Sequence, residues 1–496
     1  MFDHLSEEQK FVLSTPGDLL VIAGPGSGKT RTLVAKVVRL LEEGIPPKKI
    51  YLLTFSVKVS LELKKKLEEV GLKEVKVDTF HGFAYDLIRE KEGKPPIVLS
   101  ETERDEILKK LFPGVRDPLS REELKGIYYA YLEKNGLYDF DFLVYRASGL
   151  EGLNFKDCYV IVDEFQDLSQ DLFPLLELLK PATWLFFGDP NQSIYGFRGA
   201  NPEKLKKFLE KAKPTLKICY LTQSFRCREN ILNFAENFKA SPWSSPRLRS
   251  TIPGGEVLGF LSPDEFLEKE KISTIIKEHL GGLTLETAKI NQVSPDEIFI
   301  LSRLKVLLAP VKEWLLQQGF PVSLPEEEAR EFYQELSQFL QSQRVHHLTV
   351  EQALSEVSPE LKSYLLNLYE LFERDKEKFF AYLSNLKEVD LVLPTRQGIK
   401  LMTIHASKGL EARIVILIGG EDGIIPLTIF KDYDLEEEKR TLFVALTRAK
   451  DKFYFFIQRG RRAYGRSFEQ PSPFFLNFPI EKLEKPKPKA KQKRLF

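Results

Sequence analysis

The stretch DLLVIAGPGSGKTRT, residues 18–32, indicates the fold class of this chain more directly than any other. Its apolar start, Leu19 to Ile22, is typical of a buried strand, and the residues that follow Thr30 have the spacing of an amphipathic helix. The glycines between them allow backbone N–H groups to curl around an anion at a helix N-terminus. We therefore predict a phosphate-binding loop formed by Ala23, Gly24, Pro25, Gly26, Ser27, Gly28, Lys29, Thr30 and Arg31.

Two side chains of this loop have the chemistry that a nucleoside triphosphate requires. Lys29 can reach the β and γ phosphates, and the Thr30 hydroxyl can hold Mg²⁺. The alternative is a glycine-rich turn without a ligand, which the flanking strand and helix make the weaker interpretation. The loop thus predicts that the chain binds a nucleoside triphosphate.

A second stretch, YVIVDEFQD at residues 159–167, carries the matching acidic groups. An apolar strand that ends in Asp163 and Glu164 places two carboxylates where an α/β sheet opens its ligand crevice. Asp163 would hold Mg²⁺, and Glu164 would polarise the water that attacks the γ-phosphate. A surface acidic turn would look similar in isolation. Together with the phosphate loop, however, the stretch predicts hydrolysis of ATP or GTP.

Composition sets the outer limits. The 496 residues, with 43% hydrophobic and 29% charged side chains, predict a soluble protein of several domains. A net charge of +1 gives no overall attraction to nucleic acid, so such a partner must be argued from local sites. The three cysteines lack metal-binding spacing and suit a reducing cytosol, which predicts a cytoplasmic protein. The apolar runs are too short to span a bilayer, so no membrane contact is expected.

Longer stretches follow one another along the chain: LSEEQ (5–9), AGPGSGKT (23–30), TFSVKVSLELKKKL (54–67), DTFHGF (78–83), VDEFQD (162–167), GDPNQSIYGFRGA (188–200), QSFRCREN (223–230), LMTIHASKGLE (401–411) and VALTRAK (444–450). Together they resemble the ordered motifs of the UvrD/Rep/PcrA family, the superfamily 1A DNA helicases. The resemblance implies an α/β fold with two RecA-like P-loop motor domains. Each domain would have a parallel sheet flanked by helices and carry a mainly helical insertion.

The resemblance also assigns nucleotide contacts outside the loop. Gln9 would read adenine, because a carboxamide offers both a donor and an acceptor, and this favours ATP. Without the family context, Gln9 would be read as a solvated side chain. Phe225 would stack on the base, Gln192 would bridge the γ-phosphate to the loop that contacts DNA, and Glu411 would contact the nucleotide sugar.

Two arginines complete the implied ATP site. Arg226 would contact the γ-phosphate, and Arg448 would act as an arginine finger from the second motor domain. A guanidinium suits this role because it offers several fixed donors to charge that develops on the transferred phosphoryl group. Isolated arginines more often form surface ion pairs, so both assignments depend on the flanking motifs.

The same motifs imply a track for single-stranded DNA. Aromatic rings offer stacking surfaces that tolerate any base, and polar side chains near them can bond to backbone phosphates. The alternatives are core packing for each Phe and a structural hydrogen bond for a His. The implied stacking residues are Phe55, Phe80, Tyr195 and Phe197 with Arg198, and the implied phosphate contacts are Thr79, His81 and His405.

The chain departs from the family pattern at two positions in this track. Val57 stands where relatives usually have Asn, so one polar contact near the DNA is in doubt. Phe197 replaces a more usual Trp, which keeps a stacking ring but loses the indole donor. Neither departure affects the residues assigned to hydrolysis.

Motif spacing predicts how the domains divide the chain. The insertions read as helical in stretches such as ETERDEILKKLF (101–112), REELKGIYYAYLEK (121–134) and EFYQELSQFLQS (331–342). Both insertions are shorter than is usual in the family. The predicted parts are motor domain one at 1–85 and 150–221, its insertion at 86–149, motor domain two at 222–324 and 396–478, its insertion at 325–395, and a basic tail at 479–496.

The implied function is an ATP-dependent single-stranded DNA translocase and DNA helicase, moving 3′ to 5′ and acting in repair or replication. Its partners would be single-stranded and tailed duplex DNA, with the chain a monomer or weak dimer. The small second insertion leaves duplex separation open. The alternatives are a remodelling translocase that strips proteins with little unwinding, and a nucleotide-dependent DNA-binding regulator.

The basic tail ends in KPKPKAKQKRLF. Its composition is typical of a disordered linker, which would be either solvated or held to DNA by phosphate attraction. The end, Gln492 to Phe496, also resembles the QxxLF peptide by which bacterial replication proteins bind the sliding clamp. A Leu-Phe pair on a flexible tether is suited to binding in a groove.

Overall fold

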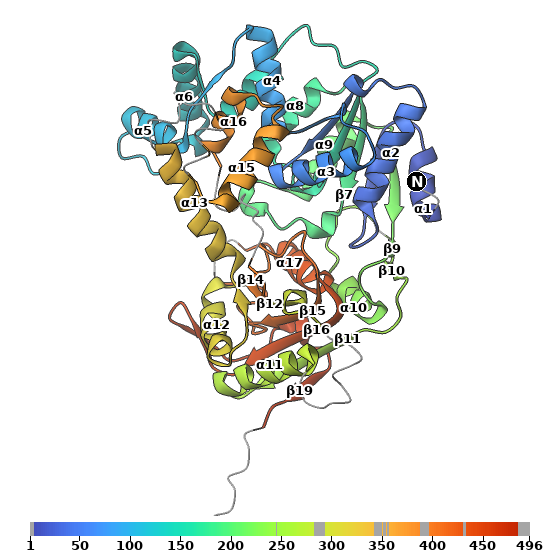
Figure 1. Ribbon diagram of the computed structural model, residues 1–496, viewed down its shortest axis with the longest axis vertical. Coiled ribbons are helices and arrows are strands. Elements are labelled where there is room, and N and C mark those ends of the chain that lie inside the picture. The colour runs from blue at the N-terminus through green and yellow to red at the C-terminus, as the bar shows by residue number, and fades with distance from the viewer. Residues whose placement is uncertain are drawn as a thin grey trace, which may run out of the picture. The chain divides into compact units, whose positions relative to one another are not determined.

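The computed structural model describes residues 4–244, 246–281, 293–341, 350, 354, 357–386, 396–429 and 433–484 (Figure 1). The chain forms two compact units. Unit 1 contains 1–222, 241–246 and 327–394, and unit 2 contains 223–240, 247–326 and 395–496. No helix in the described ranges is both long enough and apolar enough to cross a membrane.

Unit 1 is built on a parallel sheet of six strands. The strands lie in the order β3 (Lys76–Thr79), β2 (Ile50–Thr54), β6 (Tyr159–Asp163), β7 (Thr183–Gly188), β1 (Leu19–Ala23) and β8 (Lys217–Leu221). All residues of β1 are buried, as the apolar run predicted. Leu19 and Val21 enter one apolar cluster while Leu20 enters another, because alternate side chains of a strand point to opposite faces.

Helices cover both faces of this sheet. Those that share the Leu19 cluster are α1 (Glu7–Ser14), α2 (Lys29–Glu42) and α3 (Val57–Glu69). Those that share the Leu20 cluster are α4 (Phe80–Glu92), α7 (Phe140–Ser148), α8 (Phe173–Leu178) and α9 (Pro202–Ala212). Unit 1 therefore has the layered arrangement predicted for a phosphate-loop domain.

The strand order brings three loops together. Strand β7 pairs with β1 on one side and with β6 on the other, in parallel. The segments that follow Ala23, Asp163 and Gly188 therefore leave the sheet side by side at its carboxyl edge. In open parallel sheets this edge is where ligands bind.

The first insertion contains the helices that its periodicity predicted. Helix α5 (Glu101–Leu111) begins at Ser100, whose side chain forms a capping box with Glu103. Helix α6 (Glu122–Asn135) ends at Gly136, which takes the left-handed conformation at φ 64°. A short parallel pair, β4 (Ile97–Val98) and β5 (Leu137–Tyr138), joins the two ends of the insertion.

Unit 2 is built on a parallel sheet of seven strands. Their order is β13 (Val322–Ser323), β14 (Ile399–Thr403), β12 (Ile298–Ser302), β15 (Ala412–Ile418), β16 (Ala449–Gln458), β11 (Glu256–Ser262) and β19 (Ile480–Lys482). Its principal helices are α10 (Glu229–Ala235), α11 (Glu265–Leu280), α12 (Leu308–Gln317) and α17 (Leu435–Thr447). The two parallel sheets with their helices confirm the predicted α/β fold.

The second insertion packs with a different unit from the one that precedes it in the chain. It contains α13 (Pro325–Gln341), α15 (Pro359–Leu371) and α16 (Lys376–Leu383). The chain enters it from unit 2, but residues 327–394 pack with unit 1. Val57 of α3 is 2% exposed and belongs to the apolar cluster of this insertion. The apolar residue at position 57 therefore contributes to the contact between α3 and the insertion.

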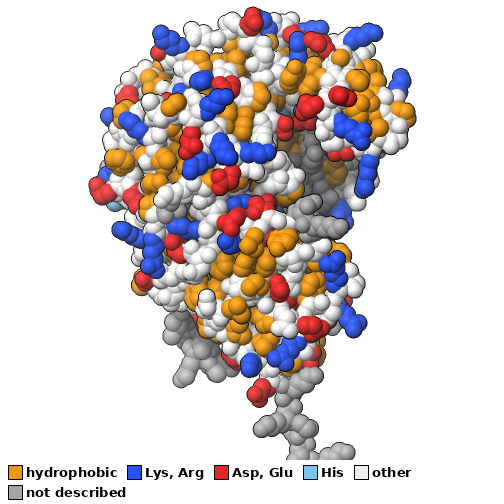
Figure 2. All heavy atoms as spheres, turned by 180° about the vertical axis from the view of Figure 1, so that it is seen from behind, with side chains coloured by type: hydrophobic (Ala, Val, Ile, Leu, Met, Phe, Trp, Pro, Cys, Tyr) orange, Lys and Arg blue, Asp and Glu red, His pale blue; other side chains and the backbone are white. Residues whose placement is uncertain are grey.

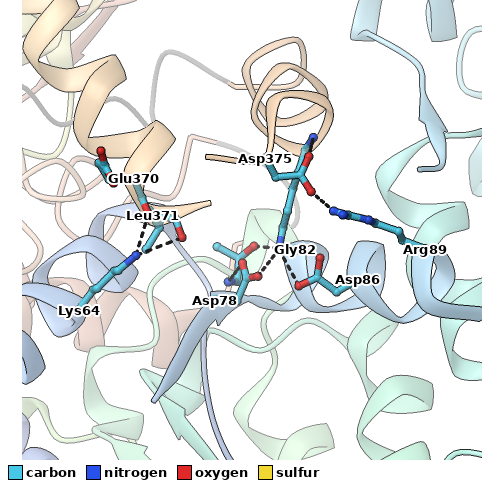
Figure 3. Close-up of polar contacts among 10 residues, drawn as sticks. Lys64, Asp78, Gly82, Asp86, Arg89, Glu370, Leu371 and Asp375 are labelled. Atoms are coloured by element: carbon cyan, nitrogen blue, oxygen red, sulfur yellow. Dashed lines mark hydrogen bonds and ion pairs between the residues drawn. The ribbon is translucent and has the colours of Figure 1, made fainter. Parts of the chain in front are cut away.

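Charged side chains join the same elements (Figure 3). Lys378 of α16 places its Nζ 2.6 Å from Asp78 Oδ2 and 2.9 Å from Asp86 Oδ2. A Cβ at Gly82 would overlap the Asp78 carboxylate, so glycine is needed beside this cluster. Two further contacts join the insertion to α3 and α4: the ion pair of Arg89 with Asp375, and the bond from Lys64 Nζ to the Glu370 carbonyl at 2.8 Å.

Candidate functional site

The phosphate loop connects β1 to α2 and has a defined backbone. Gly26 and Gly28 have φ angles of 70° and 77°, in the left-handed region where a side chain would be strained. The Gly24 amide donates to the Leu221 carbonyl at 2.9 Å, and the Ser27 amide donates to the Gly24 carbonyl at 3.2 Å. Because Gly28 is the N-cap of α2, the first amide groups of the helix lie beside the loop.

The loop also has a polar group suited to a phosphate. Ser27 Oγ is buried and has no hydrogen-bond partner within the described part of the chain. Burial of a hydroxyl without a partner is unfavourable, and a phosphate oxygen would provide the missing acceptor. Thr30, in the first turn of α2, and Asp163, at the end of β6, are the residues that would hold Mg²⁺ with the phosphates.

Lys29 lies between the two acidic residues predicted for hydrolysis. Its Nζ is 2.6 Å from Asp163 Oδ1 and 2.5 Å from Glu164 Oε1. Burial alone would lower the pKa of Lys29, but the two carboxylates outweigh burial and raise it above its usual value. Glu164 has φ 53°, which is uncommon for a residue with a side chain. The structure thus brings together three residues predicted from two separate stretches.

Gln9, the predicted adenine contact, is buried against the phosphate loop. Its Oε1 accepts from the Ser6 amide at 2.9 Å, and its Nε2 donates to the Ser27 carbonyl at 3.0 Å. The first bond is part of the capping box that begins α1. A Cβ on Gly28 would lie 2.6 Å from Gln9 Nε2 and would displace the Gln9 amide, and the φ of 77° favours glycine at this position. The adenine contact stays a prediction.

Asp189 organises the turn that follows β7. Its Oδ1 accepts from the backbone and side-chain nitrogens of Asn191, each at 3.0 Å, and its Oδ2 accepts from Gln192 Nε2 at 2.9 Å. Burial raises the pKa of Asp189 above its usual value, although these hydrogen bonds favour the ionised form. Gln192 is thus fixed in a turn at the same sheet edge as Lys29.

Gln166 is a site residue that the sequence reasoning did not identify. It is 1% exposed, and its amide bonds to Glu164 Oε2 and to the Asp189 backbone N–H. Its only sequence signal is an amide side chain within an acidic stretch. Asp189 lies 23 residues further along the chain, so local sequence does not show the second contact.

Glu411 forms ion pairs with two basic residues of unit 2. Arg226 Nε is 2.5 Å from Glu411 Oε2, and Lys450 Nζ is 2.6 Å from Glu411 Oε1. Burial alone would raise the pKa of Glu411, but Arg226 and Lys450 lower it below its usual value. The predicted γ-phosphate and sugar contacts therefore share one ionic cluster. Phe225, predicted to stack on the base, precedes Arg226 and is 47% exposed.

Arg448 is held by the backbone of unit 2. It is 1% exposed, its Nε donates to the Val444 carbonyl at 3.0 Å, and its Nη1 donates to the Leu410 carbonyl at 3.1 Å. These bonds fix the direction of the guanidinium. A fixed donor is what an arginine finger requires, and that role stays a prediction.

An accessible aromatic group lies near the turn of Gln192. The Tyr195 and Phe197 rings meet edge to face with centroids 5.9 Å apart, and Phe197 is 72% exposed. The Arg198 guanidinium carbon lies 5.3 Å from the Tyr195 centroid and 6.0 Å from the Phe197 centroid. This arrangement suits base stacking beside a cation, and the contact with DNA stays a prediction.

Phe80 corrects one prediction for this track. Its ring is 1% exposed and lies in the apolar cluster of unit 1 with Phe83 and Leu87. A base cannot stack on a ring whose faces are covered by other side chains. The core interpretation therefore holds for Phe80, because α4 begins at this residue and directs its ring inward.

The other predicted track residues differ in accessibility. Thr79 is buried, and its Oγ1 caps α4 by accepting from the Gly82 amide at 3.0 Å. The His81 ring stacks on Phe140 at 4.9 Å. Phe55 is partly buried against the unit 1 core, and His405, in unit 2, is half-buried. Their contacts with DNA stay predictions.

The charged side chains agree with a partner recognised through local sites. On the face drawn in Figure 2, Lys and Arg side chains are interspersed with Asp and Glu and form no single field of one sign. This matches the net charge of +1. Attraction to a nucleic acid on this face would therefore depend on individual contacts rather than on overall charge.

The chain is similar to known helicases along most of its length. The model of the UvrD/REP helicase N-terminal domain matches residues 5–95 and 117–213, and the UvrD-like helicase C-terminal domain matches 333–460. The ATP-dependent DNA helicase PcrA of Staphylococcus epidermidis is 26% identical over 97% of this chain and 87% of its own length. The putative ATP-dependent DNA helicase YjcD of Bacillus subtilis is 27% identical over 92% of this chain and 79% of its own length.

These matches agree with the fold and with the order of the motifs. Both domain models describe UvrD-like helicases, and together they reach into both units. The phosphate loop, the acidic strand end and the Gln192 turn all lie at one edge of the unit 1 sheet. The chain therefore belongs to the UvrD/Rep family of ATP-dependent DNA helicases.

Proposed function

We propose that this protein is a single-stranded DNA translocase and 3′ to 5′ DNA helicase that acts in DNA repair or replication. The observation that carries the proposal is the contact of Lys29 with Asp163 and Glu164 beside a glycine-formed phosphate loop. PcrA of Staphylococcus epidermidis, named as an ATP-dependent DNA helicase, supports the substrate class. The repair or replication role and the polarity rest on the family resemblance.

In the proposed reaction, Lys29 leaves its carboxylate partners in part to meet the β and γ phosphates of ATP. Glu164, once released, accepts a hydrogen bond from the attacking water and orients it. Thr30 and Asp163 would hold Mg²⁺, which neutralises developing phosphate charge. Arg226 and Arg448 would stabilise the transferred phosphoryl group, because each guanidinium is already oriented by protein contacts.

We propose that hydrolysis drives movement along one DNA strand. The motor domains would be residues 1–85 with 150–221, and 222–324 with 396–478. A ligand that contacts both domains favours the closed state because it binds that state more tightly than the open one. Hydrolysis would remove the contacts made by the γ-phosphate. Bases would then move past the exposed ring of Phe197. Gln9 and Phe225 would hold adenine.

Strand separation on matched duplexes with a 3′ or a 5′ single-stranded tail tests the proposal. The wild-type chain is expected to open the 3′-tailed duplex alone, and Lys29→Ala is expected to lose this activity. Lys49→Ala changes a half-exposed lysine of the same unit and should unwind normally. Opening of the 5′-tailed duplex alone would contradict the polarity, and unwinding that persists in Lys29→Ala would contradict the site.

One observation favours a second candidate, a translocase that strips proteins from DNA with little unwinding. The second insertion is short and packs with unit 1 through Val57 and Lys378. DNA-stimulated ATP hydrolysis with both duplexes intact would support this candidate. Displacement of streptavidin from biotin at one end of a single strand would then report the direction of movement.

Two proposals on partners follow from the sequence alone. We propose that Gln492 to Phe496, which lie outside the described residues, bind a sliding clamp. A pull-down with the tail peptide should lose the clamp when Leu495 and Phe496 are changed to Ala, and equal binding would exclude the motif. We propose a monomer or weak dimer, which sedimentation velocity across a range of protein concentrations would measure.

A further inference from the structure

Gln166 connects two loops at the edge of the unit 1 sheet. Its Nε2 donates to Glu164 Oε2 at 2.6 Å, and its Oε1 accepts from the Asp189 backbone N–H at 3.0 Å. Its own carbonyl accepts from Ser193 Oγ at 3.0 Å. One buried residue thus bonds to the predicted water-activating carboxylate and to both ends of the turn that contains Gln192.

The Gln166 amide lies directly against Gly188 at the end of β7. A Cβ at Gly188 would overlap Gln166 Oε1 and lie 2.7 Å from a ring carbon of Phe165. Only glycine therefore allows the amide to lie across the end of β7. Since Gln166 is 1% exposed, water cannot replace these bonds, and loss of either would leave a buried polar group without its partner.

Glu164 is oriented from two sides as a result. Its Oε1 lies 2.5 Å from Lys29 Nζ and its Oε2 lies 2.6 Å from Gln166 Nε2. ATP would draw Lys29 toward the phosphates, but the bond from Gln166 does not depend on Lys29. Gln166 is therefore a contact that can keep the Glu164 carboxylate aligned while ATP is bound.

Ser193, which bonds to the Gln166 carbonyl, lies just before the aromatic pair of Tyr195 and Phe197 in the chain. The two aromatic residues lie two and four residues further along the chain. Tyr195 and Phe197 carry the accessible rings described above. A shift of this segment on contact with DNA would move the Ser193 and Asp189 bonds and, through the Gln166 amide, the Glu164 carboxylate.

We propose that Gln166 is a positioning residue that aligns Glu164 for hydrolysis and makes its alignment respond to DNA bound at Tyr195 and Phe197. This inference rests on the proposed function, because it assumes that DNA stimulates ATP hydrolysis. It assigns Gln166 no contact with ATP. It therefore predicts an effect on turnover and on stimulation by DNA, and none on nucleotide affinity.

The test compares Gln166→Leu and Gln166→Glu with Gln170→Leu, which changes an exposed glutamine four residues away. Gln166→Glu keeps the shape and an acceptor for the Asp189 amide but removes the donor to Glu164. Steady-state ATP hydrolysis is measured with and without oligothymidine. Both Gln166 variants are expected to lose about tenfold or more in DNA-stimulated kcat, because small misplacements of a reacting group slow catalysis strongly.

The same experiment separates positioning from folding. The KM for ATP and the affinity for a non-hydrolysable ATP analogue should stay near wild-type values in both Gln166 variants. Their thermal unfolding midpoints should fall, because each loses a buried hydrogen bond, but should stay above the assay temperature. Gln170→Leu should match wild type throughout. Unchanged DNA stimulation in both Gln166 variants, or an equal loss of analogue binding, would overturn the inference alone. A wild-type ATPase that DNA does not stimulate would instead overturn the proposed function, and the DNA link with it.

Discussion

At the scale of single residues, exposure distinguishes Phe197, whose ring can stack on a base, from Phe80, whose ring packs in the core. Both lie in segments that resemble DNA contacts, yet Phe197 is 72% exposed and Phe80 is 1% exposed. Phe197→Ala is expected to weaken binding of oligothymidine by about 1–3 kcal/mol, the contribution of one aromatic stacking partner. Fluorescence anisotropy measures the loss. Phe11→Ala, which removes an exposed ring elsewhere in unit 1, serves as the control and should bind normally.

Phe80→Ala should reduce the stability of the fold more than it reduces DNA affinity. Removal of a buried aromatic side chain leaves a cavity and lowers the free energy of unfolding by about 3–5 kcal/mol. Denaturant unfolding followed by circular dichroism measures this change. DNA affinity, measured on the folded fraction, should change less than in Phe197→Ala. If Phe80→Ala weakened DNA binding more than Phe197→Ala while remaining stable, the core assignment of Phe80 would be wrong.

These residues also show what the sequence predicts at this scale. Lys29, Asp163 and Glu164 could be predicted because a strand followed by a turn places local side chains at a sheet edge. Gln166 could not, because its role depends on Asp189, which lies 23 residues away. Phe80 was assigned wrongly because a polar motif around an aromatic residue does not show which way the ring points.

At the scale of elements, Asp451 joins three parts of unit 2. From β16 its carboxylate accepts from Arg228, beside α10, at 2.8 Å and from Arg413 of β15 at 2.7 Å. Burial alone would raise the pKa of Asp451, but the hydrogen bonds from Arg413 and Arg228 lower it below its usual value. Since the folded-state pKa is the lower one, the ionised carboxylate stabilises the fold above the unfolded-state pKa, near 4.

Asp451→Asn should therefore destabilise unit 2 in a manner that depends on pH. At pH 7 the expected loss is about 1 kcal/mol, because the pair is partly exposed and screened by solvent. The difference from wild type should shrink as the pH falls below about 4, where the wild-type carboxylate becomes protonated. Urea unfolding at several pH values measures it, with Asp422→Asn at an exposed carboxylate as the control. A difference that grows toward low pH would contradict this assignment.

Elements were more predictable from the sequence than their contacts. Helices α5 and α6 lie where periodicity placed them, because a capping box and a left-handed glycine mark their ends. The run Leu19 to Ile22 became a parallel strand because a short, continuously apolar stretch is typical of a strand buried on both faces. The ion pairs of Asp451 join elements that begin far apart in the chain, and no local pattern identifies such partners.

At the scale of the whole molecule, the packing of the second insertion could not be predicted. Chain order places residues 327–394 inside unit 2, whereas they pack with unit 1. The contact joins Lys378 to Asp78, 300 positions away, and adds Val57 to the apolar cluster of the insertion. The departure from the family at Val57 was visible in the sequence, but its reason appears only when the insertion is seen against α3.

Val57→Asn tests the apolar part of this contact. The substitution restores the residue that relatives usually have, but in this chain it would bury an amide among apolar side chains. We expect a loss of about 1–3 kcal/mol in the free energy of unfolding, because the amide lacks partners there. Denaturant unfolding measures this, and Val57→Ile, which keeps an apolar side chain, should remain closer to wild type. Equal stability of Val57→Asn and wild type would show that the cluster does not close around this position.

The ionic part of the contact leads to a sharper prediction. Lys378→Met keeps the length of the side chain but leaves Asp78, which is 17% exposed, facing Asp86 without the ammonium between them. Removal of one partner from a buried ion pair commonly destabilises by about 3–5 kcal/mol, and the partial exposure of Asp86 suggests the lower end. The double variant Lys378→Met with Asp78→Asn should recover part of the loss, because it removes the buried uncompensated charge.

Two measurements distinguish this account from a general loss of stability. Denaturant unfolding gives the free energies of the single variants, the double variant and Lys211→Met, which changes an exposed lysine of unit 1. Limited proteolysis then reports where the chain opens. Lys378 joins α16 to Asp78 of β3. Cleavage in Lys378→Met should therefore begin within 327–394, while the sheet of unit 1 stays protected. Cleavage that begins in the sheet, or a double variant weaker than the single one, would show that the cluster does not hold the insertion in place.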